Sequence, residues 1–374
     1  AILQPDIKMP AVTNFVDGSG PIFGGSVFPF VFITIACGAI SGFHALISSG
    51  TTPKLIDNEK HIPMIGYGGM LLESFVAIMA MVAACVLEPG VFFAINSPAG
   101  IVGSDPSIVI QTINSWGFPV TQDQMEQLAK DVGETTLFAR TGGAPSLAVG
   151  MASIFADAFG KNLLAMWYHF AIMFEAVFIL TTLDAGTRVG RFMLQDILGN
   201  FHPKLGRTSW LPSTILTSAI VVACWGYFLY IGVIDPNGGV NILWPLFGIA
   251  NQMLAAIALS VGTAILIRTG KVKFAWITGL PLTWLAIITS TAAFQKVFSE
   301  DTRVGFLAAA KFMTEKVNSG MLTDEKISIM NQLIFNLRFD AVITVLLTIV
   351  LWLVIVDVLK ILFNNKYKFL GVRN

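Results

Sequence analysis

The stretch Cys37-Gly-Ala-Ile-Ser-Gly-Phe-His-Ala-Leu-Ile-Ser-Ser-Gly-Thr-Thr-Pro-Lys54 places glycines, hydroxyls and a histidine inside an apolar run that begins near Ser26. Such residues are costly in hydrocarbon unless they face packed protein or a water-filled path. Gly38, Ser41 and Gly42 lie in the middle of the run, and each glycine weakens a helix by roughly 1 kcal/mol relative to alanine. The stretch therefore predicts a broken membrane helix, by which many transporters expose backbone groups to a solute. Close packing between helices is the alternative reason for the small residues.

The composition is that of a protein that crosses a membrane several times. The chain has 374 residues, of which 55% are hydrophobic and 12% are charged, and its mean hydropathy is +0.73. Soluble domains carry about 25% charged residues. A formal net charge of +0 gives no case for nucleic-acid binding. The sequence has no metal motif, P-loop or dinucleotide fingerprint and no nucleophile–base grouping. It predicts an all-α polytopic membrane protein that is not an enzyme and needs no cofactor.

Seven apolar runs have about the 20 residues that a helix needs to cross a bilayer. A further run, Ser146–Gly160, is too short, and we expect it to form a re-entrant or surface hairpin helix. The seven predicted spans are Ser26–Ser48, Met64–Leu87, Leu163–Leu183, Thr214–Ile234, Val240–Ile267, Phe274–Phe294 and Phe339–Phe363.

Basic residues in the loops predict the orientation, because cytoplasmic loops carry an excess of Lys and Arg. The loops after the third and fifth runs and the C-terminal tail are basic and fall on one side, which is therefore predicted to be cytoplasmic. Loops 88–162 and 295–338 fall outside, and the second of them is expected to hold an amphipathic helix near Asp324–Asn336. Residues 1–24 also fall outside. Because the number of spans is odd, we expect the chain to begin inside a longer protein with helices upstream.

Three titratable side chains inside the apolar runs are candidates for proton coupling. His44 is a candidate proton relay, because histidine is the side chain whose charge ordinarily changes near neutral pH. Glu73 and Glu175 lie deep in the second and third runs, where an acid needs a partner or a proton. A structural hydrogen bond is the alternative for His44 and Glu73.

Polar residues in the third and fifth runs are candidates for ligand binding. The hydroxyls of Thr181 and Thr182, with a Phe178 carbonyl freed by a helix irregularity, suit a hard cation; the alternative is that both hydroxyls bond to the preceding helical turn. Asn251 is predicted either to bond between helices or to contact the substrate. Asp184 and Arg188 stand four residues apart, which predicts a structural ion pair on one helix face.

Three stretches resemble the carbon starvation protein A family. They are the opening stretch, then Gly66-Tyr-Gly-Gly-Met-Leu-Leu-Glu-Ser-Phe-Val-Ala-Ile-Met-Ala80, and then Thr181-Thr-Leu-Asp-Ala-Gly-Thr-Arg188. The resemblance implies a bacterial inner-membrane transporter associated with peptide uptake and pyruvate–proton symport. Members are longer than this chain, so it also implies that an N-terminal set of helices is missing here.

The family is grouped with the amino acid–polyamine–organocation superfamily, which has two inverted five-helix repeats. The resemblance implies a leucine-transporter-like fold. Residues 25–267 would form the second repeat, and residues 268–374 would add two accessory helices and a cytoplasmic tail. The third stretch also resembles the sodium-binding segment of betaine–choline–carnitine transporters. That likeness implies Phe178, Thr181 and Thr182 as a cation site, with Ala185 departing from the pattern.

The sequence therefore predicts a symporter in the bacterial inner membrane, surrounded by lipid and driven by a proton or sodium gradient. Its substrate would be a small carboxylate such as pyruvate, or peptides. The predicted substrate-binding residues are Gly38, Ser41, Gly42, His44 and Asn251. A passive channel and a sensor or assembly subunit without transport are the alternatives.

Overall fold

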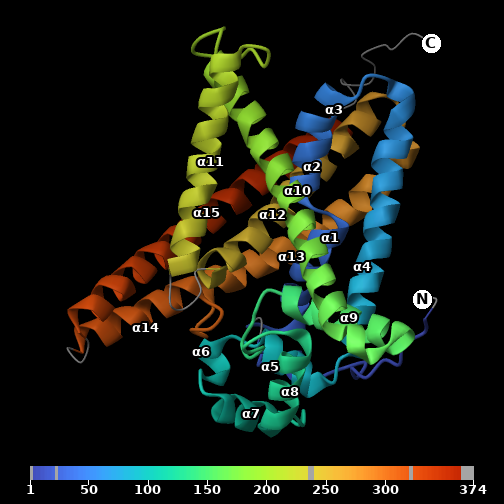
Figure 1. Cartoon of the computed structure of the whole chain (residues 1–374). Helices are drawn as coiled ribbons and strands as arrows, with labels where there is room; N and C mark the ends of the chain where they lie inside the picture. Colours follow the sequence, from blue (N-terminus) through green and yellow to red (C-terminus); the bar gives the residue numbers. More distant parts are fainter. Residues whose placement is uncertain (1–2, 22–23, 235–239, 320–322, 364–374) are drawn as a thin grey trace. The chain divides into compact units, whose positions relative to one another are not determined.

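The computed structural model describes residues 3–21, 24–234, 240–319 and 323–363, and these residues form helices and connecting turns without a strand (Figure 1). The chain divides into two compact units. The first unit comprises residues 1–23 and 52–218, and the second comprises residues 24–51 and 219–374. The all-helical class predicted from the sequence is confirmed.

Five helices among the described residues are long and apolar enough to cross a membrane. They cover five of the seven predicted spans. Of the other two, the run Ser26–Ser48 is divided into short pieces, and Thr214–Ile234 lies within α11 (Leu211–Ile234). The five candidates are Glu59–Val86, Lys161–Gly199, Phe247–Arg268, Trp276–Phe298 and Lys326–Leu362.

The first unit joins two long helices, α4 (Gly69–Val86) and α10 (Leu164–Gly199), to a set of shorter ones. α9 (Ala144–Phe159) packs against both, as Figure 1 shows. At Gly150 the approach is so close that a Cβ would overlap the backbone of Ala83. The short helix expected at Ser146–Gly160 is thus present, and its glycine allows α9 to lie against α4.

Residues 88–162, predicted as an outer loop with one short helix at Ser146–Gly160, are folded into several helices with a core of their own. Besides α9, the helices of this segment are α5 (Pro89–Asn96), α6 (Ala99–Val102), α7 (Pro106–Ser115) and α8 (Gln122–Val132), whereas the short α3 (Thr52–Leu55) precedes α4. Fully buried side chains of this core include Ile95, Ile113 and Val132. The core extends to Tyr168 and Ala171, so it also fixes the first turns of α10.

The second unit contains α1 (Phe32–Ala39), α2 (Gly42–Leu46), α12 (Val240–Arg268), α13 (Trp276–Phe298), α14 (Phe306–Asn318) and α15 (Asp324–Phe363). α12 and α13 form a hairpin that turns at Gly270, which has a φ of 77°. The hydroxyls of Thr263 and Thr278 lie 2.8 Å apart across the hairpin. α15 packs against α12, α13 and α14, and the Trp352 indole donates to the Ser290 hydroxyl at 3.0 Å.

The separate amphipathic helix expected near Asp324–Asn336 is a wrong prediction. This segment is the first part of α15, which continues without interruption for 40 residues. No glycine or proline occurs between Asp324 and Phe363, so nothing in the backbone chemistry ends the helix before the apolar run begins.

Candidate substrate site and coupling residues

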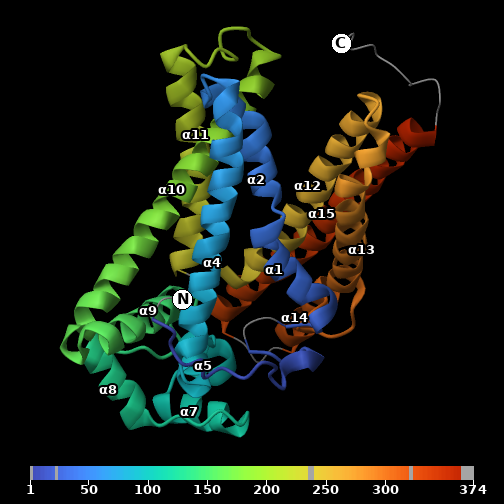
Figure 2. The same cartoon turned by 90° about the vertical axis from the view of Figure 1, so that its right-hand side faces the viewer.

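The helix predicted to break does break at the expected place. α1 ends at Ala39, α2 begins at Gly42, and Ser41 between them has an extended backbone with φ −107° and ψ 135°. Figure 2 shows α1 and α2 as separate helices joined by a short extended step. Because an extended residue cannot continue the helical hydrogen-bond ladder, backbone groups on either side of it need other partners.

Asn251 of α12 supplies one of these partners. Its Oδ1 accepts a hydrogen bond from the backbone N–H of Phe43 at 2.9 Å and another from the Ser41 hydroxyl at 3.2 Å. The side chain of Ser41 itself does not cap α2, so the cap comes from a neighbouring helix. One backbone donor that the sequence predicted to be open to a passing solute is therefore already bonded to a side-chain amide.

The two glycines of the break differ in their surroundings. A Cβ on Gly42 would overlap the backbone carbonyl oxygen of Asn251 and lie 2.6 Å from the Leu254 Cβ, whereas a Cβ on Gly38 would meet nothing within 4 Å. Close packing therefore explains Gly42 and does not explain Gly38. Ser41, Gly42 and Asn251 form one buried cluster in the second unit, and we call these three residues the Asn251 clamp.

His44 lies on α2 one turn beyond the break. Its side chain is exposed, and its ring centre is 6.2 Å from that of Phe43. The two acids predicted to couple protons lie in the first unit. Glu73 is an exposed residue of α4, and Glu175 is partly buried on α10.

The cation site predicted at Phe178, Thr181 and Thr182 falls on a regular part of α10. The helix irregularity expected there is absent, because α10 is continuous from Leu164 to Gly199. The Thr181 hydroxyl donates to the Phe178 carbonyl at 2.7 Å and that of Thr182 does so at 3.5 Å, which is the alternative arrangement in which both hydroxyls bond to the preceding turn. One turn further on, Arg188 and Asp184 form the predicted ion pair at 2.8 Å.

Sequence reasoning missed two buried charged residues of the second unit. Lys296 near the end of α13 is 4% exposed, and Asp340 in α15 is 3% exposed. Both stand where an apolar run meets a polar segment: Lys296 falls in the predicted loop 295–338, and Asp340 is the second residue of the predicted span Phe339–Phe363. The length of the helices was the signal that could have found them, because neither helix has a breaking residue nearby.

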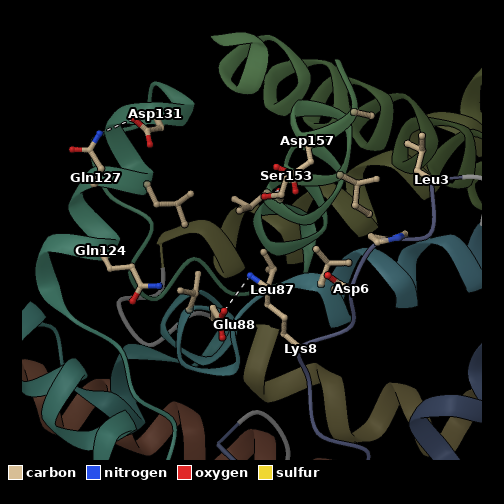
Figure 3. Close-up of a pocket in the computed structure, with 17 residues that line it drawn as sticks. Leu3, Asp6, Lys8, Leu87, Glu88, Gln124, Gln127, Asp131, Ser153 and Asp157 are labelled. Atoms are coloured by element: carbon tan, nitrogen blue, oxygen red, sulfur yellow. Dashed lines mark hydrogen bonds and ion pairs between the residues drawn. The ribbon is translucent and has the colours of Figure 1, made fainter. Parts of the chain in front are cut away.

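The first unit contains a cavity of about 850 Å³ that the sequence did not predict. Figure 3 shows it between the N-terminal segment, the start of α5, α8 and α9. Lys8 bridges Glu88 at 3.1 Å on one side, and Asp131 accepts a hydrogen bond from Gln127 at 2.7 Å. With Asp6 and Asp157 also in its wall, the cavity carries more acidic than basic groups.

Among the described residues, no three or more His, Cys, Asp or Glu side chains are grouped so that they could hold a metal ion. The candidate functional groups of the described residues are thus the Asn251 clamp, the acids Glu73 and Glu175 on the long helices, and the buried Lys296 and Asp340 of the second unit. Together with the five helices able to span a membrane, these features define a multi-pass helical membrane protein.

Comparison with known proteins identifies the family. The chain belongs to the carbon starvation protein CstA family, whose model matches residues 1–292, as the sequence motifs predicted. It is 53% identical to the peptide transporter CstA of Escherichia coli over 93% of the chain and 51% of that protein. It is 48% identical to the pyruvate/proton symporter BtsT of the same organism over 100% of the chain and 54% of that protein. The peptide transporter CstA of Bacillus subtilis is 40% identical over 79% of the chain and 46% of its own length.

The chain thus spans about half the length of the curated relatives that it matches. No solved structure matches it at a significant level.

Proposed function

We propose that the protein is a secondary active symporter that imports a small carboxylate such as pyruvate, or peptides, across the bacterial inner membrane. The observation that carries this proposal is the helix broken at Ser41 and clamped by Asn251. The names of the relatives, a peptide transporter and a pyruvate/proton symporter, support the substrate classes and a proton as the coupling ion.

The chemistry of the break suits an anionic substrate. The first turn of α2 presents the partly positive end of a helix, and discontinuous helices commonly use such ends to hold substrate carboxylates. A carboxylate oxygen can take the place of Asn251 Oδ1 as acceptor for the Phe43 N–H and the Ser41 hydroxyl. Gly38, Gly42 and His44 would complete this site. The exchange of one acceptor for another gives the clamp two states, one with and one without substrate.

The proposed architecture is leucine-transporter-like. In this arrangement residues 25–267 form a five-helix repeat with the outer segment 88–162. Residues 268–374 provide two accessory helices with the outer segment 295–338, and residues 1–24 form a further outer segment.

Two coupling schemes follow from the polar residues of the long helices. In the first, His44, Glu73 or Glu175 binds a proton that enters with the substrate. In the second, Phe178, Thr181 and Thr182 hold Na⁺, which requires their present hydrogen bonds to open. The relative named a pyruvate/proton symporter favours the first scheme.

Uptake into proteoliposomes tests the proposal. We expect an imposed inward proton gradient to drive accumulation of labelled pyruvate or of labelled dipeptides, and a proton uncoupler to abolish it. If flux is insensitive to every imposed gradient, the protein is a passive channel; if no substrate moves, it acts as a sensor or assembly subunit.

The variant Asn251→Ala tests the clamp. It removes two hydrogen bonds, each contributing about 0.5–1.5 kcal/mol, so we expect the concentration for half-maximal uptake and the maximal rate both to change. Asn318→Ala, at an exposed asparagine of α14 in the same unit, is the matched control and should transport normally. Normal uptake by Asn251→Ala would show that the Asn251 clamp is not part of the substrate site.

A further inference from the structure

The second unit has two charged side chains shielded from solvent, and both lie beside one small apolar cluster. Lys296 and Asp340 are the only charged residues that are buried in the part of the chain for which burial is described. Val297, Phe306 and Ala341 form the cluster. Lys296 directly precedes Val297, and Asp340 directly precedes Ala341. The fold therefore brings a buried cation and a buried carboxylate to the same region of α13 and α15.

Two aromatic rings lie near the ammonium group of Lys296. Its Nζ lies 5.1 Å from the ring centre of Phe30 and 5.8 Å from that of Phe306. Within about 6 Å the negative face of an aromatic ring attracts a cation, and more strongly where water is excluded. These contacts favour the charged form of Lys296 despite its burial.

The carboxylate of Asp340 has no comparable support. Its Oδ2 is buried without a hydrogen-bond partner, and Asp340 takes part in none of the ion pairs seen among the described residues. The backbone carbonyl of Asp340 accepts a hydrogen bond from the Thr344 hydroxyl. A buried carboxylate oxygen with no partner is costly while it is charged, and acquisition of a proton removes that cost.

Few other charges face Asp340 from the helices packed against α15. α12 carries only Arg268, which is exposed at its far end, and α13 carries only Lys296. The neighbouring charged residues of α15 and α14 are exposed: Arg338, Lys311, Glu315 and Lys316. In the connecting loop, Asp301 is paired with Arg303. Apart from Lys296, the described charged side chains that these helices and the loop carry near Asp340 are therefore exposed or paired.

We propose that Asp340 is a proton-binding site whose loading and unloading accompanies transport. The inference rests on the proposed proton symport and adds the residue that carries the ion. A proton from the aqueous phase adds to a carboxylate oxygen and gives the neutral acid, which needs no counter-charge in its apolar setting. Loss of the same proton regenerates the carboxylate, whose charge is costly in that buried setting. The two forms favour different arrangements of α13 and α15, which links the proton to a conformational change.

The test uses the protein at its native length in liposomes. The variant Asp340→Asn keeps the shape of the side chain and cannot titrate. We expect it to lose accumulation driven by a pH gradient while it still exchanges labelled for unlabelled substrate across the membrane. Asp357→Asn is the matched control, because Asp357 is an exposed carboxylate on the same helix, paired with Lys360 at 3.0 Å. It should accumulate substrate as the wild type does.

An infrared difference spectrum between high and low pH gives a readout that does not depend on transport. We expect a protonated-carboxyl band in the wild type and in Asp357→Asn that is missing in Asp340→Asn. If Asp340→Asn does not fold, Asp340→Glu replaces it, and this variant should retain the band at a shifted pH midpoint.

The outcomes separate the inference from the proposed function. Proton-driven accumulation that survives in Asp340→Asn overturns the inference and leaves symport intact. A wild type without proton-driven uptake, but with the Asp340 band, overturns symport and leaves the proton-binding site. A pH difference spectrum that is identical in the wild type and Asp340→Asn overturns the site itself.

Discussion

At the scale of single residues, the two glycines of the broken helix have different roles. Gly42 is required because the backbone of Asn251 lies where a side chain would begin, whereas Gly38 faces open space. From the sequence alone the same role is predicted for both, because both are glycines in one apolar run. Only the position of α12, which is set by contacts distant in sequence, distinguishes them.

Alanine substitutions test this difference. We expect Gly42→Ala to destabilise the protein by about 1–3 kcal/mol through overpacking and to reduce uptake. Gly38→Ala is the control for packing: a Cβ there meets no neighbour within 4 Å, so this variant should not be destabilised, and its helix gains about 1 kcal/mol in propensity. Thermal unfolding in detergent together with uptake in liposomes measures both effects. Equal losses in the two variants would contradict the packing assigned to Gly42.

At the scale of helices, capping decides how α7 begins. Asp105 is the N-cap, and its carboxylate accepts a hydrogen bond from the Ser107 N–H at 2.9 Å. Hydrogen bonds from the Ser107 hydroxyl and then from its backbone hold the pKa of Asp105 below its usual value of 3.8. Because the folded protein depresses this pKa, the cap contributes fully above pH 3.8 and is lost as the pH falls through the lower, folded value.

Hydrogen exchange of the α7 peptide checks the cap. Relative to intrinsic rates, we expect the wild type to lose protection as the pH falls below 3.8, and Asp105→Asn to show a weaker pH dependence. The control Asp123→Asn, in the first turn of α8, where Thr121 is the cap, should leave α7 unchanged. Protection in the wild type that does not change with pH would show that the carboxylate does not hold the cap.

Which helices could be predicted depended on local signals. The spans at Met64–Leu87 and Phe274–Phe294 are long apolar runs, and helices α4 and α13 cover most of each. The break at Ser41 was also predictable, because the glycines and hydroxyls around it are visible in the local sequence and disfavour a regular helix in hydrocarbon. The helical fold of residues 88–162 was not, since its core is assembled from short segments whose burial depends on one another.

At the scale of the whole molecule, the orientation in the membrane is a prediction from loop charges. Arg268 is the last residue of α12, and Lys271 and Lys273 follow it, whereas the segment after α13 is mixed in charge. Since cytoplasmic loops are enriched in Lys and Arg, the two ends of α13 should lie on opposite sides of the bilayer.

Labelling with a membrane-impermeant maleimide tests this orientation after the three native cysteines are replaced by serine. Thr302→Cys should react in intact cells, and Thr269→Cys should react only in inverted vesicles. Both positions are exposed turns on either side of α13, so each is the control for the other. The reverse pattern would invert the predicted topology.

The length of α15 has a mechanical consequence. With 40 residues at about 1.5 Å each, it measures about 60 Å, twice the roughly 30 Å of a hydrocarbon layer. Tilts of membrane helices rarely exceed about 40°, so tilting cannot hide the whole helix, and its polar N-terminal turns must stand in water. A stiff rod that is anchored in lipid and projects beyond it acts as a lever: a small rotation at the buried end becomes a larger sweep at the tip.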